Sequence, residues 1–298
     1  MSGTNPSISL LHFNDNRAIE IANLLDIPHL KIDVHTFPDK EAKVTLPILS
    51  TDAIAIYLSL DDPDSKLVTL MLACATLQQS HHKPIVLLAP YLCYMRQDIA
   101  FEIGEAVSQQ IIGRFLASYV TDVITVDAHL HRTAELIQAV PCKNAVNLSS
   151  AKLQADFLRT QHNNALLIGP DAESEQWVSQ VAQLANLEYL VANKQRTDDH
   201  TVSISLPDYD LDGREIILID DIASTGQTLA TCAKQVSRQA VRSINALITH
   251  ALFDPSAEQV MQQSGIQSIW STDSILHDSN HISLTPLLAD ALKDYCKP

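Results

Sequence analysis

Two adjacent carboxylates followed by a loop of small polar residues are the part of this chain best suited to chemistry. Asp220 and Asp221 come directly after the apolar run 216–219. Backbone N–H groups and the positive end of a following helix would make the next loop an anion site. Carboxylates repel phosphate, so we expect the two acids to bind sugar hydroxyl groups or a divalent cation. The loop residues with a hydroxyl group or no side chain are Ser224, Thr225, Gly226 and Thr228. The alternative is an acidic strand end before an ordinary capped helix.

Lys194 and Arg196 form a second candidate group. They are two positions apart, so on an extended segment their side chains point to the same side. Two cations projecting from a short loop can neutralise the charge that develops on a phosphoryl group during transfer. A solvated basic edge that discourages strand pairing is the alternative explanation.

Further candidates follow predicted strands in the first half of the chain. Arg96 and Gln97 come shortly after the apolar run 85–89, where a guanidinium could bind phosphate or stack on a base. A solvated turn is the alternative. The segment FPDKE contributes one aromatic ring and two carboxylates, Phe37, Asp39 and Glu41. Considered alone, this segment is a connection between strands.

Composition limits the classes of protein that this chain could belong to. Among 298 residues, 20 Lys and Arg stand against 35 Asp and Glu, and the net charge of −15 argues against a nucleic-acid partner. Any phosphate site must therefore be local, built from a few cations, backbone N–H groups and Mg²⁺. The five cysteines lack C-x-x-C spacing, which indicates reduced thiols. No apolar run approaches the ~18 residues that cross a bilayer. We therefore expect a cytoplasmic protein without a membrane partner.

The elements that must position these residues alternate between strands and helices, which predicts an α/β fold with mostly parallel sheets. Apolar runs predict strands at 8–13, 30–34, 54–60, 85–89, 123–127, 166–169, 189–192, 202–206, 216–219, 244–250 and, last, 267–270. Helical spacing predicts helices that include 105–119, 148–161, 174–186 and 284–295.

The two halves of the chain look alike. Residues 123–136 and 216–229 both place acids at the end of a strand and before a helix, where ligands of open α/β sheets bind. We predict two similar domains, residues 1–145 and 146–298, and the closing helix could pack back on the N-terminal domain.

The acidic segment after 216–219 also resembles a known motif. Asp-Asp-x-x-x-Thr-Gly-x-Thr is similar to the phosphoribosyl-pyrophosphate (PRPP) motif of phosphoribosyltransferases and PRPP synthetases. This resemblance implies phosphoribosyltransferase-like domains in which Ser224, Thr225, Gly226 and Thr228 hold the 5-phosphate of ribose. It implies that Asp220 and Asp221 hold the 2- and 3-hydroxyl groups. The N-terminal domain would carry the ATP-site segments.

Other segments resemble the PRPP synthetases, or ribose-phosphate pyrophosphokinases, specifically. The Tyr-x-Arg-Gln-Asp run implies that Arg96 and Gln97 contact ATP. Phe-x-Asp-x-Glu implies that Phe37, Asp39 and Glu41 line the adenine pocket of a neighbouring subunit, so the protein would be a homo-oligomer. Lys-x-Arg implies that Lys194 and Arg196 are catalytic. His129 and Asp171 match residues that bind Mg²⁺ or its ATP complex.

The resemblance implies transfer of a pyrophosphoryl group from Mg·ATP to ribose 5-phosphate, giving PRPP and AMP. The chain departs from the family pattern at three places: Lys40 replaces a glycine, Ile99 replaces a basic residue, and Glu173, Ser174 and Glu175 replace a Gly-rich segment. Two alternatives therefore stay open, a non-catalytic homologue that binds nucleotide or partner subunits, and a phosphoribosyltransferase that consumes PRPP. From the segment 104–110 we also expect weak allosteric regulation.

Overall fold

The chain forms two compact α/β units. A computed structural model describes residues 8–51, 53–198 and 201–296, and the side chains of residues 194–203 lie outside what it describes. The first unit comprises Met1–Leu148 and Thr285–Pro298, and the second comprises Ser149–Leu284. We predicted a domain boundary between residues 145 and 146, and the chain passes into the second unit after Leu148.

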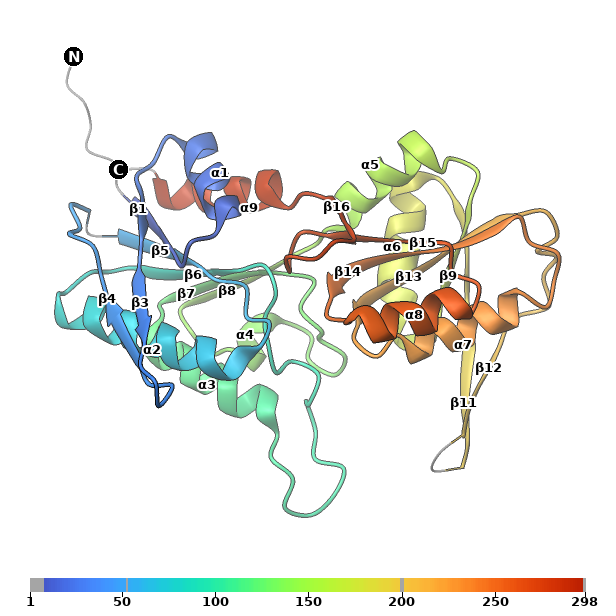
Figure 1. Cartoon of the computed structure of the whole chain (residues 1–298), viewed down its shortest axis with the longest axis horizontal. Helices are drawn as coiled ribbons and strands as arrows, with labels where there is room; N and C mark the ends of the chain where they lie inside the picture. The colour runs from blue at the N-terminus through green and yellow to red at the C-terminus, as the bar shows by residue number, and fades with distance from the viewer. Residues whose placement is uncertain (1–7, 52, 199–200, 297–298) are drawn as a thin grey trace. The chain divides into compact units, whose positions relative to one another are not determined.

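The first unit is built on a six-stranded sheet in the order β2-β1-β5-β6-β7-β8, with every pair parallel. Its helices are α1 (Asn16–Leu25), α2 (Pro63–Gln79), α3 (Ser108–Tyr119), α4 (Leu136–Ala139) and α9 (Thr285–Leu292). Figure 1 shows α1 and α9 on one face of this sheet and α2 and α3 on the other. The strands are β1 (Ile8–His12), β2 (His29–Lys31), β5 (Ala53–Tyr57), β6 (Ile85–Ala89), β7 (Asp122–Val126) and β8 (Asn144–Leu148).

The second unit repeats this arrangement with a parallel sheet in the order β10-β9-β13-β14-β15-β16. Helices α5 (Ala151–Gln161) and α6 (Glu175–Ala185) cover one face, while α7 (Gln227–Val236) and α8 (Pro255–Gln263) cover the other. The strands are β9 (Leu166–Gly169), β10 (Glu188–Val191), β13 (Glu215–Ala223), β14 (Ser243–Ala251), β15 (Ser268–Thr272) and β16 (Asn280–Ile282). Strands buried on both faces explain the continuous apolar runs.

A two-stranded antiparallel hairpin follows the second sheet strand of each unit. In the first unit it is β3 (Asp33–Thr36) with β4 (Ala42–Thr45), and in the second it is β11 (Asn193–Asp198) with β12 (Thr201–Ser205). Both units therefore share strand order, strand direction and the position of an inserted hairpin. The predicted fold class, two similar α/β domains with mostly parallel sheets, is confirmed.

Several predicted element boundaries were wrong. Helix α3 begins at Ser108 instead of residue 105, and the predicted strand 30–34 is divided between β2 and β3. The last strand is β16, not the predicted strand at 267–270. None of the helices within the described ranges is long and apolar enough to span a membrane.

Candidate functional site

The acid pair lies within a strand, not after one. β13 was predicted to end at residue 219, but pairing with β14 continues through Ala223, so Asp220 lies beside Ile248. Asp221 is only 3% exposed, and its backbone N–H donates to Asp220 Oδ1 over 3.0 Å. Burial, and then the negative charges of Asp221 and Asp171, raise the pKa of Asp220 well above its usual range. Acids from the ends of β9 and β13 therefore gather at one edge of the sheet.

Asp171 has a structural role in addition to its predicted metal role. It follows β9 and caps the 3₁₀-helix η1 (Ala172–Ser174), where its Oδ1 accepts from the backbone N–H groups of Glu173 and Ser174 at 3.1 and 3.2 Å. Ser174 is fully buried, and Glu173 is exposed. The segment that replaces the family's Gly-rich run is thus a capped turn. Its first N–H groups are already bonded to the aspartate.

Hard carboxylate oxygens are the donors that Mg²⁺ prefers, and a divalent cation would offset the burial and the repulsion that raise the Asp220 pKa. The carboxylates of Asp171, Asp220 and Asp221 therefore fit the cation that the family resemblance implies. No group of three or more His, Cys, Asp or Glu side chains is arranged to hold a metal ion in the part of the chain that the structure describes. His129 and Asp171 belong to different units.

The predicted phosphate loop joins β13 to α7. Gly226 caps α7 with a φ of +68°, and the backbone N–H of Gln227 is 3.5 Å from Thr225 Oγ1. A Cβ at Gly226 would lie 2.7 Å from Met261 Cγ on α8. Glycine is thus required here by the positive φ and by helix packing, a reason that the sequence analysis did not foresee.

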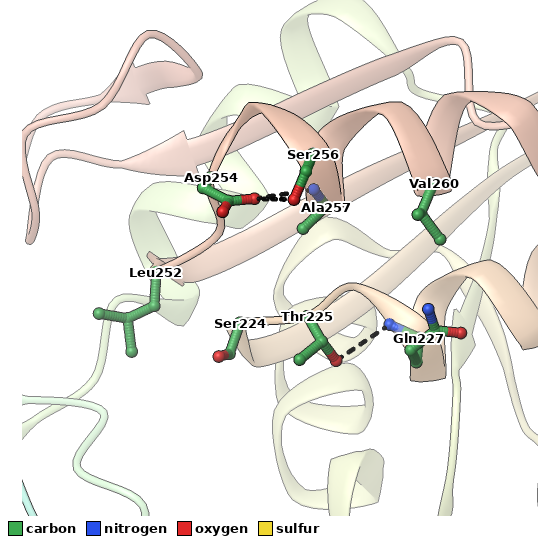
Figure 2. A pocket seen from close by; sticks show the side chains of 8 residues that line it. All are labelled: Ser224, Thr225, Gln227, Leu252, Asp254, Ser256, Ala257 and Val260. Carbon is green, nitrogen blue, oxygen red and sulfur yellow. Dashed lines mark hydrogen bonds between the residues drawn. The ribbon is translucent and has the colours of Figure 1, made fainter.

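A cavity of about 430 Å³ opens beside this loop. Figure 2 shows Asp254 and Ser256, at the start of α8, across from Ser224 and Thr225. The Ser256 hydroxyl and the Ala257 N–H donate to Asp254, which lowers the pKa of its carboxyl. The cavity therefore combines hydroxyl groups with one carboxylate. Its lining residues are Ser224, Thr225, Gln227, Leu252, Asp254, Ser256, Ala257 and Val260.

Lys194 and Arg196 lie on β11, not on the short loop that was predicted. Their backbones pair with Ile204 and Val202 of β12. The side chains of both residues lie outside the described part of the chain.

The predicted adenine-pocket residues lie on the turn between β3 and β4. The Phe37 ring is 40% exposed and makes an edge contact with His35, with ring centroids 4.8 Å apart. The Lys40 N–H donates to the Phe37 carbonyl over 2.8 Å. Lys40 has a φ of +72°, so the lysine adopts the left-handed conformation that glycine accepts more easily. Asp39 Oδ1 accepts from the Glu41 N–H over 3.2 Å.

Arg96 and Gln97 follow β6. Arg96 is exposed, whereas Gln97 is partly buried and donates through Nε2 to the Ile99 carbonyl over 3.1 Å. His129 is partly buried just after β7, and His131 is exposed. All of these residues belong to the first unit.

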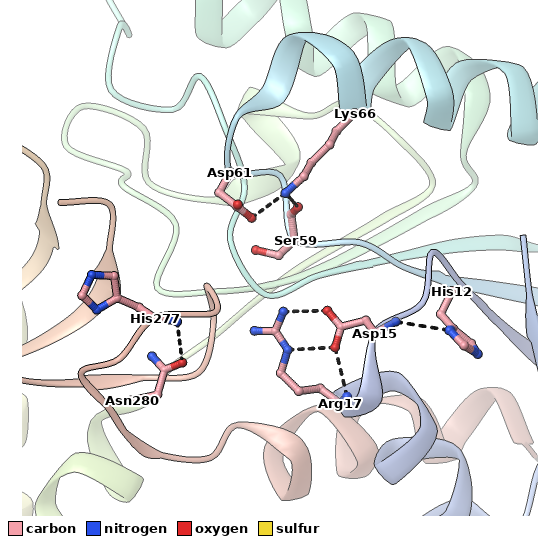
Figure 3. A network of polar contacts seen from close by, with 8 residues as sticks. All are labelled: His12, Asp15, Arg17, Ser59, Asp61, Lys66, His277 and Asn280. Atoms are coloured by element: carbon pink, nitrogen blue, oxygen red, sulfur yellow. Dashed lines mark hydrogen bonds and ion pairs between the residues drawn. The ribbon is translucent and has the colours of Figure 1, made fainter. Parts of the chain in front are cut away.

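A polar cluster that was not predicted from the sequence lies at the carboxyl ends of β1 and β5. Figure 3 shows the Arg17 guanidinium bound to the carboxylate of Asp15, with contacts of 2.9 and 2.6 Å. The same guanidinium lies 5.7 Å from the Tyr57 ring centroid. Lys66 contacts Asp61 at 2.8 Å and the Ser59 carbonyl at 3.0 Å. The polar segment 14–17 and the acidic turn 60–64 are signals for this cluster in the sequence.

The fold and the position of the acid pair define a class of protein: a chain of two phosphoribosyltransferase-type domains with an acidic, hydroxyl-rich loop at a sheet edge. Comparison with known proteins agrees. The model for the N-terminal domain of ribose phosphate pyrophosphokinase matches residues 8–119. The phosphoribosyl transferase domain model matches residues 143–285.

Curated relatives match nearly end to end. Ribose-phosphate pyrophosphokinase 2 of Archaeoglobus fulgidus is 30% identical over 254 residues, covering 85% of this chain and 88% of the relative. Ribose-phosphate pyrophosphokinase of Methanopyrus kandleri is 28% identical and covers 92% of this chain and 94% of the relative. The crystal structure of phosphoribosylpyrophosphate synthetase from Mycobacterium smegmatis shares the fold, with a TM-score of 0.82, 18% identity, and coverage of 96% of this chain and 98% of that chain.

This chain belongs to the ribose-phosphate pyrophosphokinase family, a family of transferases, as the motif resemblance indicated.

Proposed function

We propose that this protein is a ribose-phosphate diphosphokinase. The 1-hydroxyl oxygen of ribose 5-phosphate bonds to the β-phosphorus of ATP. The bond between that phosphorus and the oxygen that bridges it to the α-phosphorus breaks. AMP leaves, the hydroxyl proton is released, and PRPP forms. The observation that carries this proposal is the acid pair, with Asp221 buried and Asp220 partly buried, followed by the 224–228 loop inside the segment that matches the phosphoribosyl transferase domain.

The second unit would bind ribose 5-phosphate. The N-terminus of α7 and the hydroxyl groups of Ser224, Thr225 and Thr228 suit a phosphate, and Gly226 lets the backbone approach it. Asp220 and Asp221 can accept hydrogen bonds from the 2- and 3-hydroxyl groups, which would orient the ring so that its 1-hydroxyl lies in line for attack.

The first unit would bind ATP through Arg96 and Gln97, with Phe37, Asp39 and Glu41 reaching the adenine pocket of a neighbouring subunit. This arrangement requires at least a dimer. The half-exposed ring of Phe37 on a hairpin tip supports that assignment. Light scattering should therefore find a dimer or larger assembly, and a monomer that retained full activity would contradict the shared pocket.

Lys194, Arg196 and Mg²⁺ would stabilise the transferred group, with His129 and Asp171 as the metal-site residues. When bound, Mg²⁺ neutralises charge on the phosphate oxygens. We expect Lys194→Ala to lower kcat by about 10²–10⁴, in line with the loss of a preorganised phosphate stabiliser. Lys152→Ala, an exposed substitution on α5, should leave kcat unchanged. A decrease in kcat of less than tenfold for Lys194→Ala would show that Lys194 is not a catalytic residue.

Phosphorus NMR of the purified protein with ribose 5-phosphate, ATP and Mg²⁺ tests the whole proposal. AMP and PRPP should appear in equal amounts. ADP in place of AMP would show that a single phosphoryl group is transferred and that the proposed reaction is wrong. No turnover with retained ATP or ribose 5-phosphate binding would favour a non-catalytic homologue. Consumption of added PRPP with a nucleobase would favour a phosphoribosyltransferase.

A further inference from the structure

Asp98 is a buried carboxylate that the proposed function leaves without a role. Its side chain is only 3% exposed, and Oδ1 lies 2.8 Å from a terminal nitrogen of Arg132. Oδ2 is also buried and has no hydrogen-bond partner among the described residues. A buried charge of this kind depends strongly on its cationic partner.

The ion pair joins two segments that carry proposed ATP-site residues. Asp98 directly follows Arg96 and Gln97, and Arg132 lies three residues after His129. In sequence the partners are 34 residues apart. The ion pair therefore fixes the segment after β6 against the segment after β7, at the carboxyl edge of the first sheet.

Gln109 on α3 strengthens the same junction. It is 3% exposed, its Nε2 donates to the Met95 carbonyl over 3.1 Å, and its backbone N–H donates to the Gln97 carbonyl over 3.1 Å. Its Oε1 accepts from the Thr133 hydroxyl over 3.2 Å. Both segments thus meet at one buried amide as well as at the ion pair.

We propose that Arg132 and Asp98 are positioning residues that hold Arg96 and Gln97 in a fixed relation to His129 for binding a nucleoside triphosphate. The pair acts on the position of the binding residues and does not contact the reacting atoms. The identity of the nucleotide as ATP rests on the proposed function. The geometry of the ion pair does not depend on it.

The test uses the full chain with Arg132→Gln, which removes the charge and leaves Asp98 buried without a cation. We expect the KM for ATP to rise about tenfold, while the KM for ribose 5-phosphate changes less than twofold, because that substrate is assigned to the second unit. Arg132→Lys keeps the positive charge but loses the planar guanidinium group, so the rise in the KM for ATP should be intermediate. Arg114→Gln, on the exposed face of α3, is the matched control and should change neither KM.

The double variant Asp98→Asn with Arg132→Gln separates positioning from simple destabilisation. A neutral amide pair removes the unpaired charge, so it should recover at least half of the loss in ATP affinity on a logarithmic scale. Equal rises in both KM values, or a lowered Tm with an unchanged KM for ATP, would overturn the proposal.

Direct titration with ATP keeps this test separate from the reaction. If the wild-type chain binds ATP without turnover, the proposed function fails, and weaker ATP binding by Arg132→Gln still supports the positioning role. Unchanged ATP binding by that variant, or no ATP binding by the wild-type chain, would refute it.

Discussion

Asp220 carries a charge that the folded chain disfavours in the absence of a ligand. Burial raises the pKa of its carboxyl, and the negative charges of Asp221 and Asp171 raise it further. The same burial, with the charges of Asp220 and Asp171, raises the pKa of the Cys232 thiol to about 12. A site that concentrates negative charge in this way suits binding of sugar hydroxyl groups or a cation, and it lowers stability when no ligand is bound.

Asp220→Asn should therefore stabilise the protein at high pH. The folded-state pKa of Asp220 lies above its unfolded value, so between these two pKa values the folded state binds more protons than the unfolded state. Stability therefore falls as the pH rises through this range. We expect the Tm in EDTA at pH 8 to increase by about 2–4 °C. The gain should become small near pH 4, where the wild-type carboxyl is protonated in the folded state and partly protonated in the unfolded state.

Asp208→Asn, an exposed carboxylate in the same unit, is the control and should show no pH-dependent gain. A lower Tm for Asp220→Asn at pH 8 would mean that the repulsion is already compensated in the folded chain.

At the scale of elements, the phosphate loop depends on how α7 and α8 pack. Met261 on α8 is fully buried and occupies the space that a side chain at residue 226 would need. The loop geometry is therefore set by a residue 35 positions further along the chain as well as by its own turn.

Gly226→Ala should destabilise the protein more than an ordinary glycine substitution in a turn. Gly213 also has a positive φ, of +70°, but a Cβ there would meet nothing within 4 Å. Gly213→Ala thus measures the backbone strain alone, and Gly226→Ala adds the clash with Met261. We expect the extra loss in the free energy of unfolding to be about 1–3 kcal/mol by urea denaturation. Equal losses in the free energy of unfolding for the two variants would show that Met261 on α8 can move aside without destabilising the protein.

The β3–β4 turn shows the opposite case, a side chain in a position that favours glycine. Lys40→Gly relieves a left-handed residue, worth about 1–2 kcal/mol, against an entropy cost of about 0.5–1 kcal/mol. We expect the free energy of unfolding to rise by up to about 1.5 kcal/mol. Lys43→Gly, within β4, should lower it by about 0.5–1 kcal/mol. If Lys40→Gly destabilised the protein as much as Lys43→Gly does, the turn would not be strained.

At the scale of the whole molecule, the chain leaves the first unit and returns to it. Residues 285–298 belong to that unit, and α9 packs against α1 with Leu288 and Leu292 buried. The Tyr295 hydroxyl donates to Asp122 Oδ1 at the start of β7 over 3.1 Å. The first unit therefore needs the end of the chain to complete its core.

Tyr295→Phe should lower the free energy of unfolding by about 1 kcal/mol, because it leaves the carboxylate of the buried Asp122 without one of its donors. Tyr189→Phe, an exposed substitution on β10, should change it by less than about 0.5 kcal/mol. Removal of residues 285–298 should destabilise the protein far more, which thermal unfolding would show as a lower Tm. An unchanged Tm after this truncation would show that the first unit is complete without α9.

The sequence by itself determined the alternation of apolar runs and helical segments, the acid pair with its hydroxyl-rich loop, and the family that these motifs resemble. Each depends on residues a few positions apart, whose periodicity and turn preferences act locally. The tertiary structure alone decided that β13 runs on to Ala223 beside β14, that Met261 requires Gly226, and that Arg132 pairs with Asp98. These features come from contacts between residues far apart in the chain, and such contacts exist only once helices and sheets have packed.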